Sequence, residues 1–140
     1  MAITYDPQKV IVTFKGSRLT GFMDGTFLSA ERSGDSFAIA VGTDGEVARA
    51  SLADKSGEVK LTLMQTSQGN DILSAALAAD ELTKLGTGTL MVKDSSGRTL
   101  LQSKDAWVKK PATVEFGKEI GGREWTLVCG NLEIVNIGGN

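Results

Sequence analysis

Carboxylates are the side chains best suited to chemistry in this chain, because the sequence contains no histidine and a single cysteine, Cys129. The absence of histidine excludes the common zinc sites, the Ser-His-Asp and Cys-His nucleophile pairs and imidazole bases. A pair of acids could still serve a glycosidase, and a cluster of acids could bind calcium. The candidate acids are Glu31, Asp35, Asp44, Glu46, Asp80 and Glu81. Their positions match neither a glycosidase pair nor a calcium-binding loop, and they lie beside turns or on an exposed helix face. We therefore expect no catalytic, cofactor-binding or metal-binding residue.

Four further features also have simpler structural explanations. The run GTGT at 86–89 is not a phosphate-binding loop, because it lacks the glycine spacing and the following helix. Cys129 lies on an alternating apolar strand without a basic partner, so we expect a small buried core residue. The basic run at 109–111 is too small for nucleic-acid binding. Trp107 and Trp125 are expected in the core. Nothing here indicates an enzyme.

Length and charge narrow the class of protein. The chain has 140 residues, of which 41% are hydrophobic and 23% charged, and its net charge is −2. This size and apolar content suit one domain, residues 1–140, with its own core. The charge argues against a dedicated nucleic-acid or anionic-membrane binder.

A mainly β fold is expected from the many Val, Ile and Thr residues and from regular alternation. The clearest strand is 58–65, where Val59, Leu61 and Leu63 should point into the core and Glu58, Lys60 and Thr62 away from it. Other strands are predicted at 9–14, 27–32, 89–93, 99–103, 125–129 and 132–137. Turn residues between these strands favour sequential antiparallel pairing, including hairpins through 94–97 and through 130–131.

One helix is predicted over about residues 68–85, a run rich in Ala and Leu. Ser67 can cap its start, Lys84 lies in its last turn, and Gly86 or Gly88 can end it. The helix should lie against the sheet, which gives an antiparallel β-sandwich or barrel with one α-helix.

Residues 33–56 form a long extended loop in this interpretation. Turn residues bracket two short apolar pieces, 37–41 and 47–52. The loop is either an ordinary surface hairpin or an arm that reaches a neighbouring subunit.

A series of segments resembles the tail-tube (inner tube) protein family of contractile-tailed bacteriophages. They are YDPQKV at 5–10, GFMDGTFLSAER at 21–32, DSF at 35–37, VGTDGEVAR at 41–49 and LTLMQTSQGND at 61–71. The resemblance covers most of the chain and is densest over 21–71. These segments are specific as a series rather than one at a time.

The resemblance implies a structural virion protein that forms hexameric rings, and these rings stack into the inner tube of a contractile tail. The tube would form the channel for DNA delivery. The implied partners are further copies of the chain, the tail sheath protein, the baseplate or tube initiator, and, inside the lumen without specific binding, the tape measure protein and genomic DNA. No membrane partner, cofactor or enzymatic activity is implied. The expected location is the phage tail, after synthesis in the host bacterial cytoplasm.

Two groups of residues become candidates through this resemblance. The long loop is where the family makes contacts between rings, and its candidate residues are Phe37, Val41, Asp44, Glu46, Arg49 and Leu52. Glu58, Lys60 and Thr62 are candidates for the lumen. Sequence alone leaves open whether their face meets the lumen or the helix.

Other functions remain compatible with the sequence. A tube initiator or baseplate component would form a single ring, and the tube of a phage-like injection machine would pass no genome. A small-ligand-binding β-barrel would be a stable monomer with an enclosed apolar pocket. Self-assembly separates this last alternative from the others.

Overall fold

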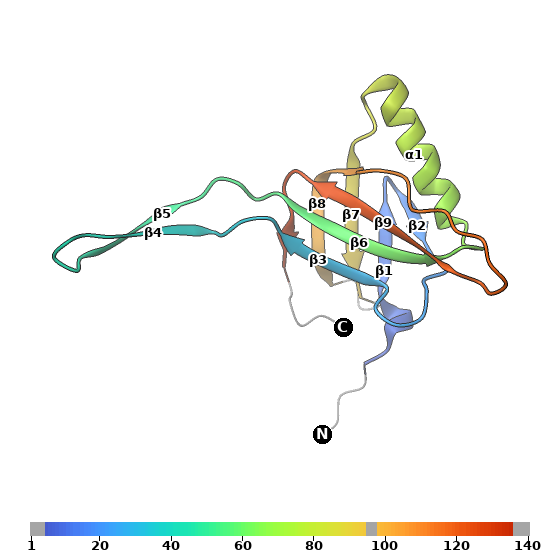
Figure 1. Ribbon diagram of the computed structural model, residues 1–140, viewed down its shortest axis with the longest axis horizontal. Helices are drawn as coiled ribbons and strands as arrows, with labels where there is room; N and C mark the ends of the chain where they lie inside the picture. The colour runs from blue at the N-terminus through green and yellow to red at the C-terminus, as the bar shows by residue number, and fades with distance from the viewer. Residues whose placement is uncertain (1–4, 95–97, 136–140) are drawn as a thin grey trace.

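The computed structural model describes residues 5–94 and 98–135 (Figure 1). In these residues the chain forms an eight-stranded antiparallel sheet in the order β2-β1-β7-β8-β9-β6-β3, with β10 paired to β8, and a separate two-stranded sheet, β4-β5. The elements are a 3₁₀ turn at Pro7–Lys9, β1 Ile11–Phe14, β2 Ser17–Leu19, β3 Leu28–Arg32, β4 Phe37–Val41, β5 Val47–Ser51, β6 Gly57–Met64, α1 Gly69–Thr83, β7 Gly88–Lys93, β8 Thr99–Val108, β9 Gly122–Cys129 and β10 Glu133–Ile134.

The large sheet folds over itself at β8. This strand pairs with β10 beside Leu101 and with β9 beside Ala106–Val108, while β7 occupies its opposite edge. Figure 1 shows β3, β6 and β9 in front of β1, β7 and β8. The two halves enclose the core as the layers of a sandwich do. The predicted mainly β, antiparallel fold with one helix is confirmed within the described residues.

Alternation on β6 and β1 places the core as predicted. Val59, Leu61 and Leu63 are fully buried, as are Val12 and Phe14 on β1. Each such side chain contributes about 1.5–3 kcal/mol by leaving water. The register of both strands is therefore strongly determined, because a slip of one residue would expose every one of these side chains.

Helix α1 packs its Leu73 and Leu77 side chains into this core. The Ser67 hydroxyl accepts a hydrogen bond from the Gly69 N–H at 3.0 Å and donates one to the Thr20 carbonyl. The N-cap residue is Gln68, whose side chain makes no cap bond, so Ser67 bonds the first helical N–H from the position before the cap rather than as the predicted cap residue. At 2.9 Å the Trp125 indole N–H donates to Asn70 Oδ1, and the Asn70 amide donates to the Met64 carbonyl at 2.8 Å. These bonds fix the start of α1 to β6 and β9.

The predicted glycine stop of the helix is wrong. The helix ends at Thr83, and Lys84 itself adopts the left-handed conformation, with φ 63°. Gly86 serves a different purpose, because its N–H donates to Asp80 Oδ1 at 3.0 Å. A Cβ at Gly86 would lie 2.2 Å from the Asp80 Cβ, so glycine is required for close approach rather than for the cap.

Strand pairing near the C-terminus also differs from the prediction. The final strand does not return along β9 through a hairpin at 130–131 but crosses to β8, where Ile134 pairs with Leu101. The Gly130 N–H donates to the Asp105 carbonyl and the Leu132 N–H to the Lys55 carbonyl, which directs the chain away from β9. Residues 136–137 of the predicted strand lie outside the described residues.

The hairpin between β7 and β8 is confirmed by the pairing of Lys93 with Thr99, although its turn at 95–97 lies outside the described residues. Strand β2 was not predicted. It pairs with β1 through Lys15 and Gly16, whose φ angles of 53° and 83° match a two-residue hairpin turn.

Candidate assembly surfaces

Residues 33–56, which we call the arm, contain the longest run of exposed residues in the described chain, 33–51. Figure 1 shows it projecting from the body as a long hairpin that continues β3 and β6. Every residue of β4 and β5 is exposed. The turn is closed by the Gly42 N–H donating to the Glu46 carbonyl and by the Glu46 N–H donating to Asp44 Oδ1. An isolated two-stranded hairpin is marginally stable in water, so its apolar surface calls for a partner.

The two faces of the arm differ in character. Phe37 pairs with Ser51, Ile39 with Arg49 and Val41 with Val47, so their side chains share one face. The opposite face carries four alanines, Ala38, Ala40, Ala48 and Ala50. The guanidinium carbon of Arg49 lies 4.1 Å from the centre of the Phe37 ring.

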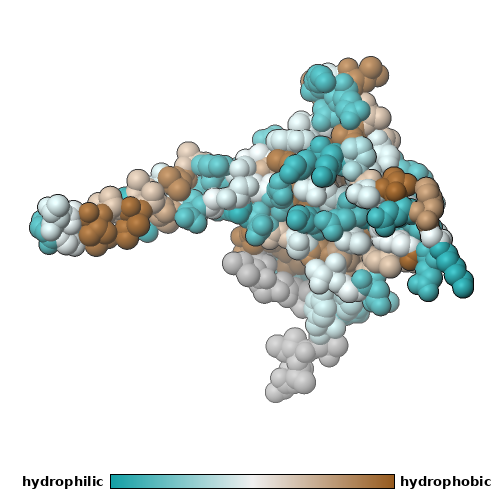
Figure 2. Space-filling model, in the orientation of Figure 1, coloured by the Kyte–Doolittle hydropathy of each residue, from teal (hydrophilic) through white to brown (hydrophobic). Residues whose placement is uncertain are grey.

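The large apolar side chains of the arm are strongly exposed. The exposed fraction is 73% for Ile39 and 62% for both Val41 and Val47. Figure 2 shows hydrophobic surface along the arm, with a more polar tip. A monomer rarely presents a contiguous apolar surface of this kind without a binding role. Leu52, by contrast, is half-buried near the root.

The root of the arm contains an irregularity between the two strand pairs. Arg32 pairs with Gly57 and Phe37 pairs with Ser51, so four residues (33–36) on one side face five residues (52–56) on the other. The extra residue acts as a bulge, which bends and twists a hairpin. Within it, Asp54 accepts hydrogen bonds from the hydroxyl and the N–H of Ser56 at 2.7 and 2.9 Å. These bonds lower the pKa of the Asp54 carboxyl.

The predicted lumen residues lie together on the outer face of β6. Lys60 is exposed, and Glu58 and Thr62 are partly buried between neighbouring strands. The Lys109 ammonium pairs with Glu58 Oε1 at 3.2 Å. The helix packs against β2 and β8 instead, so this face is not covered by α1. The assignment of this face to the lumen stays a prediction.

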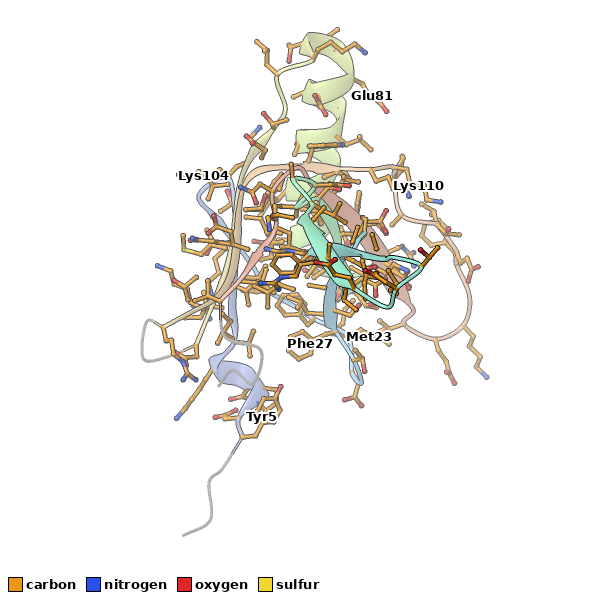
Figure 3. The ribbon with its side chains drawn as sticks, turned by 90° about the vertical axis from the view of Figure 1, so that its left-hand side faces the viewer. Tyr5, Met23, Phe27, Glu81, Lys104 and Lys110 are labelled. Carbon is orange, nitrogen blue, oxygen red and sulfur yellow. The ribbon has the colours of Figure 1, made fainter. Side chains whose placement is uncertain are left out.

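Polar side chains of the adjacent strands extend this outer face. Ser29 and Glu31 of β3 lie beside Lys60 and Glu58, and Glu124 and Thr126 of β9 lie on their other side. A groove of about 530 Å³ separates the face from the chain that follows β8 and is lined by Lys109, Lys110 and Glu115 among others. Figure 3 looks along the arm and shows Lys110 on one side of the body and Lys104 on the other. In the basic run at 109–111, Lys109 forms the ion pair with Glu58, and Lys110 lines the groove.

The connection between β8 and β9, residues 109–121, is a second exposed apolar surface that the sequence reasoning missed. Val114, Phe116 and Ile120 have exposed fractions of 63%, 83% and 53%. Three apolar residues in a connection rich in charged residues could have indicated this surface in the sequence. Arg123 holds this connection in place by donating to the Glu115 carbonyl at 2.8 Å.

The residues considered for chemistry are dispersed. No group of three or more Cys, Asp or Glu in the described ranges is placed to hold a metal ion. Cys129 is buried, and burial raises the pKa of its thiol, partly opposed by a hydrogen bond with Ser103. Trp125 is buried as expected, whereas Trp107 is only partly buried. In the part of the chain that is described, no helix is long and apolar enough to span a bilayer.

One family model matches most of the chain, including the residues of the arm. The model of the bacteriophage PhiTE tail tube protein matches residues 15–137, which is most of the chain. This chain belongs to the PhiTE tail tube family. The resemblance found in the sequence is therefore confirmed. A structural protein, ORF10, of Pseudomonas phage KPP10 is 29% identical over 150 residues, covering 98% of this chain and 83% of the relative. The family to which this chain belongs is therefore one of phage structural proteins.

Solved structures with the same fold come from contractile injection systems. The cap that terminates the tube of the anti-feeding prophage has a TM-score of 0.63 at 16% identity, over 97% of this chain and 95% of the cap. The sheath/tube terminator of the extracellular contractile injection system PVC has a TM-score of 0.67 at 13% identity, over 96% and 98%. The PVC sheath–tube complex in its extended state gives 0.65 at 12% identity, over 96% and 93%. Because these identities are only 12–16%, the likeness establishes the fold of this chain alone.

Proposed function

We propose that this tail tube protein assembles into hexameric rings, that the rings stack into the inner tube of a contractile tail, and that the tube is the channel for DNA. The observation that supports this proposal is the arm, a hairpin with an exposed apolar face in a chain that belongs to the tail tube family. The protein acts by assembly and not as an enzyme. It is made in the host bacterial cytoplasm and becomes part of the virion tail.

Ring closure has a physical basis in the sheet order. β2 and β3 are the terminal strands of the large sheet, so each leaves one edge without a partner in the described chain. Free edges invite uncontrolled pairing, and a closed ring of identical subunits removes them. The sheath protein surrounds the tube, and the baseplate or tube initiator starts it. The solved sheath–tube complex with this fold supports the sheath as a partner.

The outer face of β6 lines the lumen in this proposal. Glu31, Glu58 and Glu124 oppose Lys60 and Lys109 there, so the face is polar with a small excess of negative charge. Such a wall offers DNA phosphates no net release of counterions, so genomic DNA would pass without sticking. The tape measure protein would occupy the same channel before DNA passes. A reconstruction of the tube that places Glu58 and Lys60 away from the channel would contradict this assignment.

Arm-mediated stacking is tested by removing the arm. Replacing residues 37–51 by a short glycine-serine turn removes only exposed residues, so the body should keep its unfolding temperature. Electron microscopy across a concentration series, with light scattering for mass, should show long tubes for the natural chain and no long tubes for the variant. Tubes of unaltered length would refute the role of the arm.

The same experiment separates the alternatives. A tube initiator or baseplate component would stop at a single ring, and the terminator structures with this fold make that alternative concrete. The tube of an injection machine without a genome would stack equally well but would be isolated free of DNA. A small-ligand-binding barrel would remain monomeric at every concentration.

A further inference from the structure

The arm and the β8–β9 connection lie at opposite ends of the molecule. Figure 1 shows the arm extending on one side and the connection on the other. Strand β6 joins them, because Gly57 pairs with Arg32 at the arm root and Gln65, directly after β6, contacts the connection. Eight strand residues span about 25 Å. The arm therefore cannot reach this connection in its own chain.

The far end of β6 carries a groove of about 420 Å³ that is open to solvent. It is lined by Gln65, Glu115, Phe116, Lys118, Glu119 and Arg123, together with glycines. The groove is held by hydrogen bonds that do not depend on a partner. At 2.9 Å the Gly121 N–H donates to Gln65 Oε1, and the Gln65 N–H donates to the Gly121 carbonyl at 3.0 Å. A groove formed in advance lowers the ordering cost of docking.

Arg123 is the nearly buried cation of the groove. This residue is only 8% exposed, and its guanidinium donates to the Gly122 and Glu115 carbonyls and lies 5.5 Å from the centre of the Phe116 ring. The ion pairs in the described residues are Arg98 with Asp94 and Lys109 with Glu58, so no carboxylate pairs with Arg123 there. A nearly buried charge without a carboxylate favours an incoming anion. Lys118 is a second cation in the lining, and Glu115 and Glu119 balance the formal charge of the whole groove, so the attraction for an anion is local to Arg123 and Lys118.

We propose that the arm of one copy docks in this groove of a second copy in the next ring. The acidic arm tip, Asp44 and Glu46, would meet Lys118 and Arg123, and the apolar arm face would cover Phe116 and Ile120. The inference rests on the proposed tube, of which it identifies the stacking contact. Because each copy offers an arm at one end and a groove at the other, the contact is head-to-tail and repeats without closing. The tube is therefore polar, with unfilled grooves at one end and unpaired arms at the other.

Cysteine cross-linking tests this contact directly. Two tagged chains, one with Val47→Cys and the other with Ile120→Cys, are mixed, assembled and oxidised, with the buried Cys129 left in place. We expect covalent dimers that join one chain of each kind, in excess over either homodimer. Combining both substitutions in one chain should give a ladder that continues beyond the number of subunits in a ring. A second pair, Val41→Cys with Phe116→Cys, provides the same test if a substitution of the first pair prevents assembly.

Charge reversal supplies an independent readout. Asp44→Lys with Glu46→Lys should raise the concentration needed for tube formation about tenfold. Adding Lys118→Glu should restore part of that loss. Lys104→Glu, on the side of the body opposite Lys110 in Figure 3, is the matched control and should restore none of it.

The outcomes separate this inference from the proposed function. Tubes in micrographs without cross-links from either cysteine pair would overturn the groove as the arm's partner and leave the tube in place. A ladder that ends at the number of subunits in one ring would place the contact within a ring and also overturn it. Absence of rings and tubes at every concentration would overturn the proposed function and this inference together.

Discussion

Substituting Ile39 by serine should weaken stacking without unfolding the subunit. Ile39 lies on the large apolar face of the arm and is 73% exposed. Burying a whole isoleucine side chain is worth about 1.5–3 kcal/mol, so docking the exposed part gains about 1–2 kcal/mol for each subunit. The concentration at which tubes begin to form should therefore rise about 5- to 30-fold. The subunit itself should change in stability by less than about 0.5 kcal/mol, as exposed substitutions usually do.

Sedimentation across a concentration series measures this threshold, and electron microscopy of the pellet identifies tubes. Leu82→Ser is the matched control, because Leu82 is 85% exposed but lies on α1, away from the arm. In Figure 3 its neighbour Glu81 is at the outer end of that helix. The control should leave the threshold unchanged in the absence of sheath. The reasoning fails if Ile39→Ser assembles at the natural threshold, or if Leu82→Ser raises it equally.

Three further experiments, a substitution, a thiol-labelling reaction and a titration, test the body and the arm root. Asn70→Ala leaves the buried Trp125 indole without its hydrogen-bond acceptor, so we expect a loss of about 2 kcal/mol and a Tm about 6–8 °C lower in thermal unfolding; an unchanged Tm would contradict the role of this bond. Burial raises the pKa of the Cys129 thiol, so the folded protein at pH 8 should react with a maleimide far more slowly than the denatured chain; equal rates would show that the thiol is accessible. The Ser56 hydrogen bonds lower the pKa of Asp54 below its ordinary value of 3.8, so the carboxylate supports the arm root at neutral pH and this support is lost only as the pH falls through the lowered pKa. An NMR titration midpoint at or above 3.8 would exclude these bonds in solution.

Local patterns predicted the parts of the fold that depend on neighbouring residues. The β6 alternation was readable because one of its faces is fully buried, and the helix was readable from its Ala and Leu content. Strand β2 has only three residues, one of which is the exposed Arg18, so no alternation could develop. The helix end was misjudged because Lys84 takes a conformation usually assigned to glycine.

Long-range pairings were beyond the reach of these patterns. The crossing of β10 to β8 depends on hydrogen bonds from Leu132 and Gly130 to residues far away in the chain. The groove around Arg123 likewise combines the end of β6 with residues more than fifty positions later. The arm was located by its turn residues, yet the sequence left undecided whether it is a surface hairpin or a contact with a neighbour. The structure adds the exposed apolar face that favours the second interpretation.

Because of the bulge at the arm root, the alternation of β3 and β6 does not predict which side of the arm carries its large apolar side chains. Counting by twos from the outward Glu31 on β3 predicts that Phe37 and Ile39 face the same side as the candidate lumen residues. Counting backward by twos from Glu58 on β6 assigns that side to Ala48 and Ala50 instead. Both cannot hold, and the additional residue in 52–56 accommodates the difference by bending and twisting the hairpin. In the proposed tube this bend would let one continuous pair of strands line the channel in its own ring and turn its apolar face to another copy in the next.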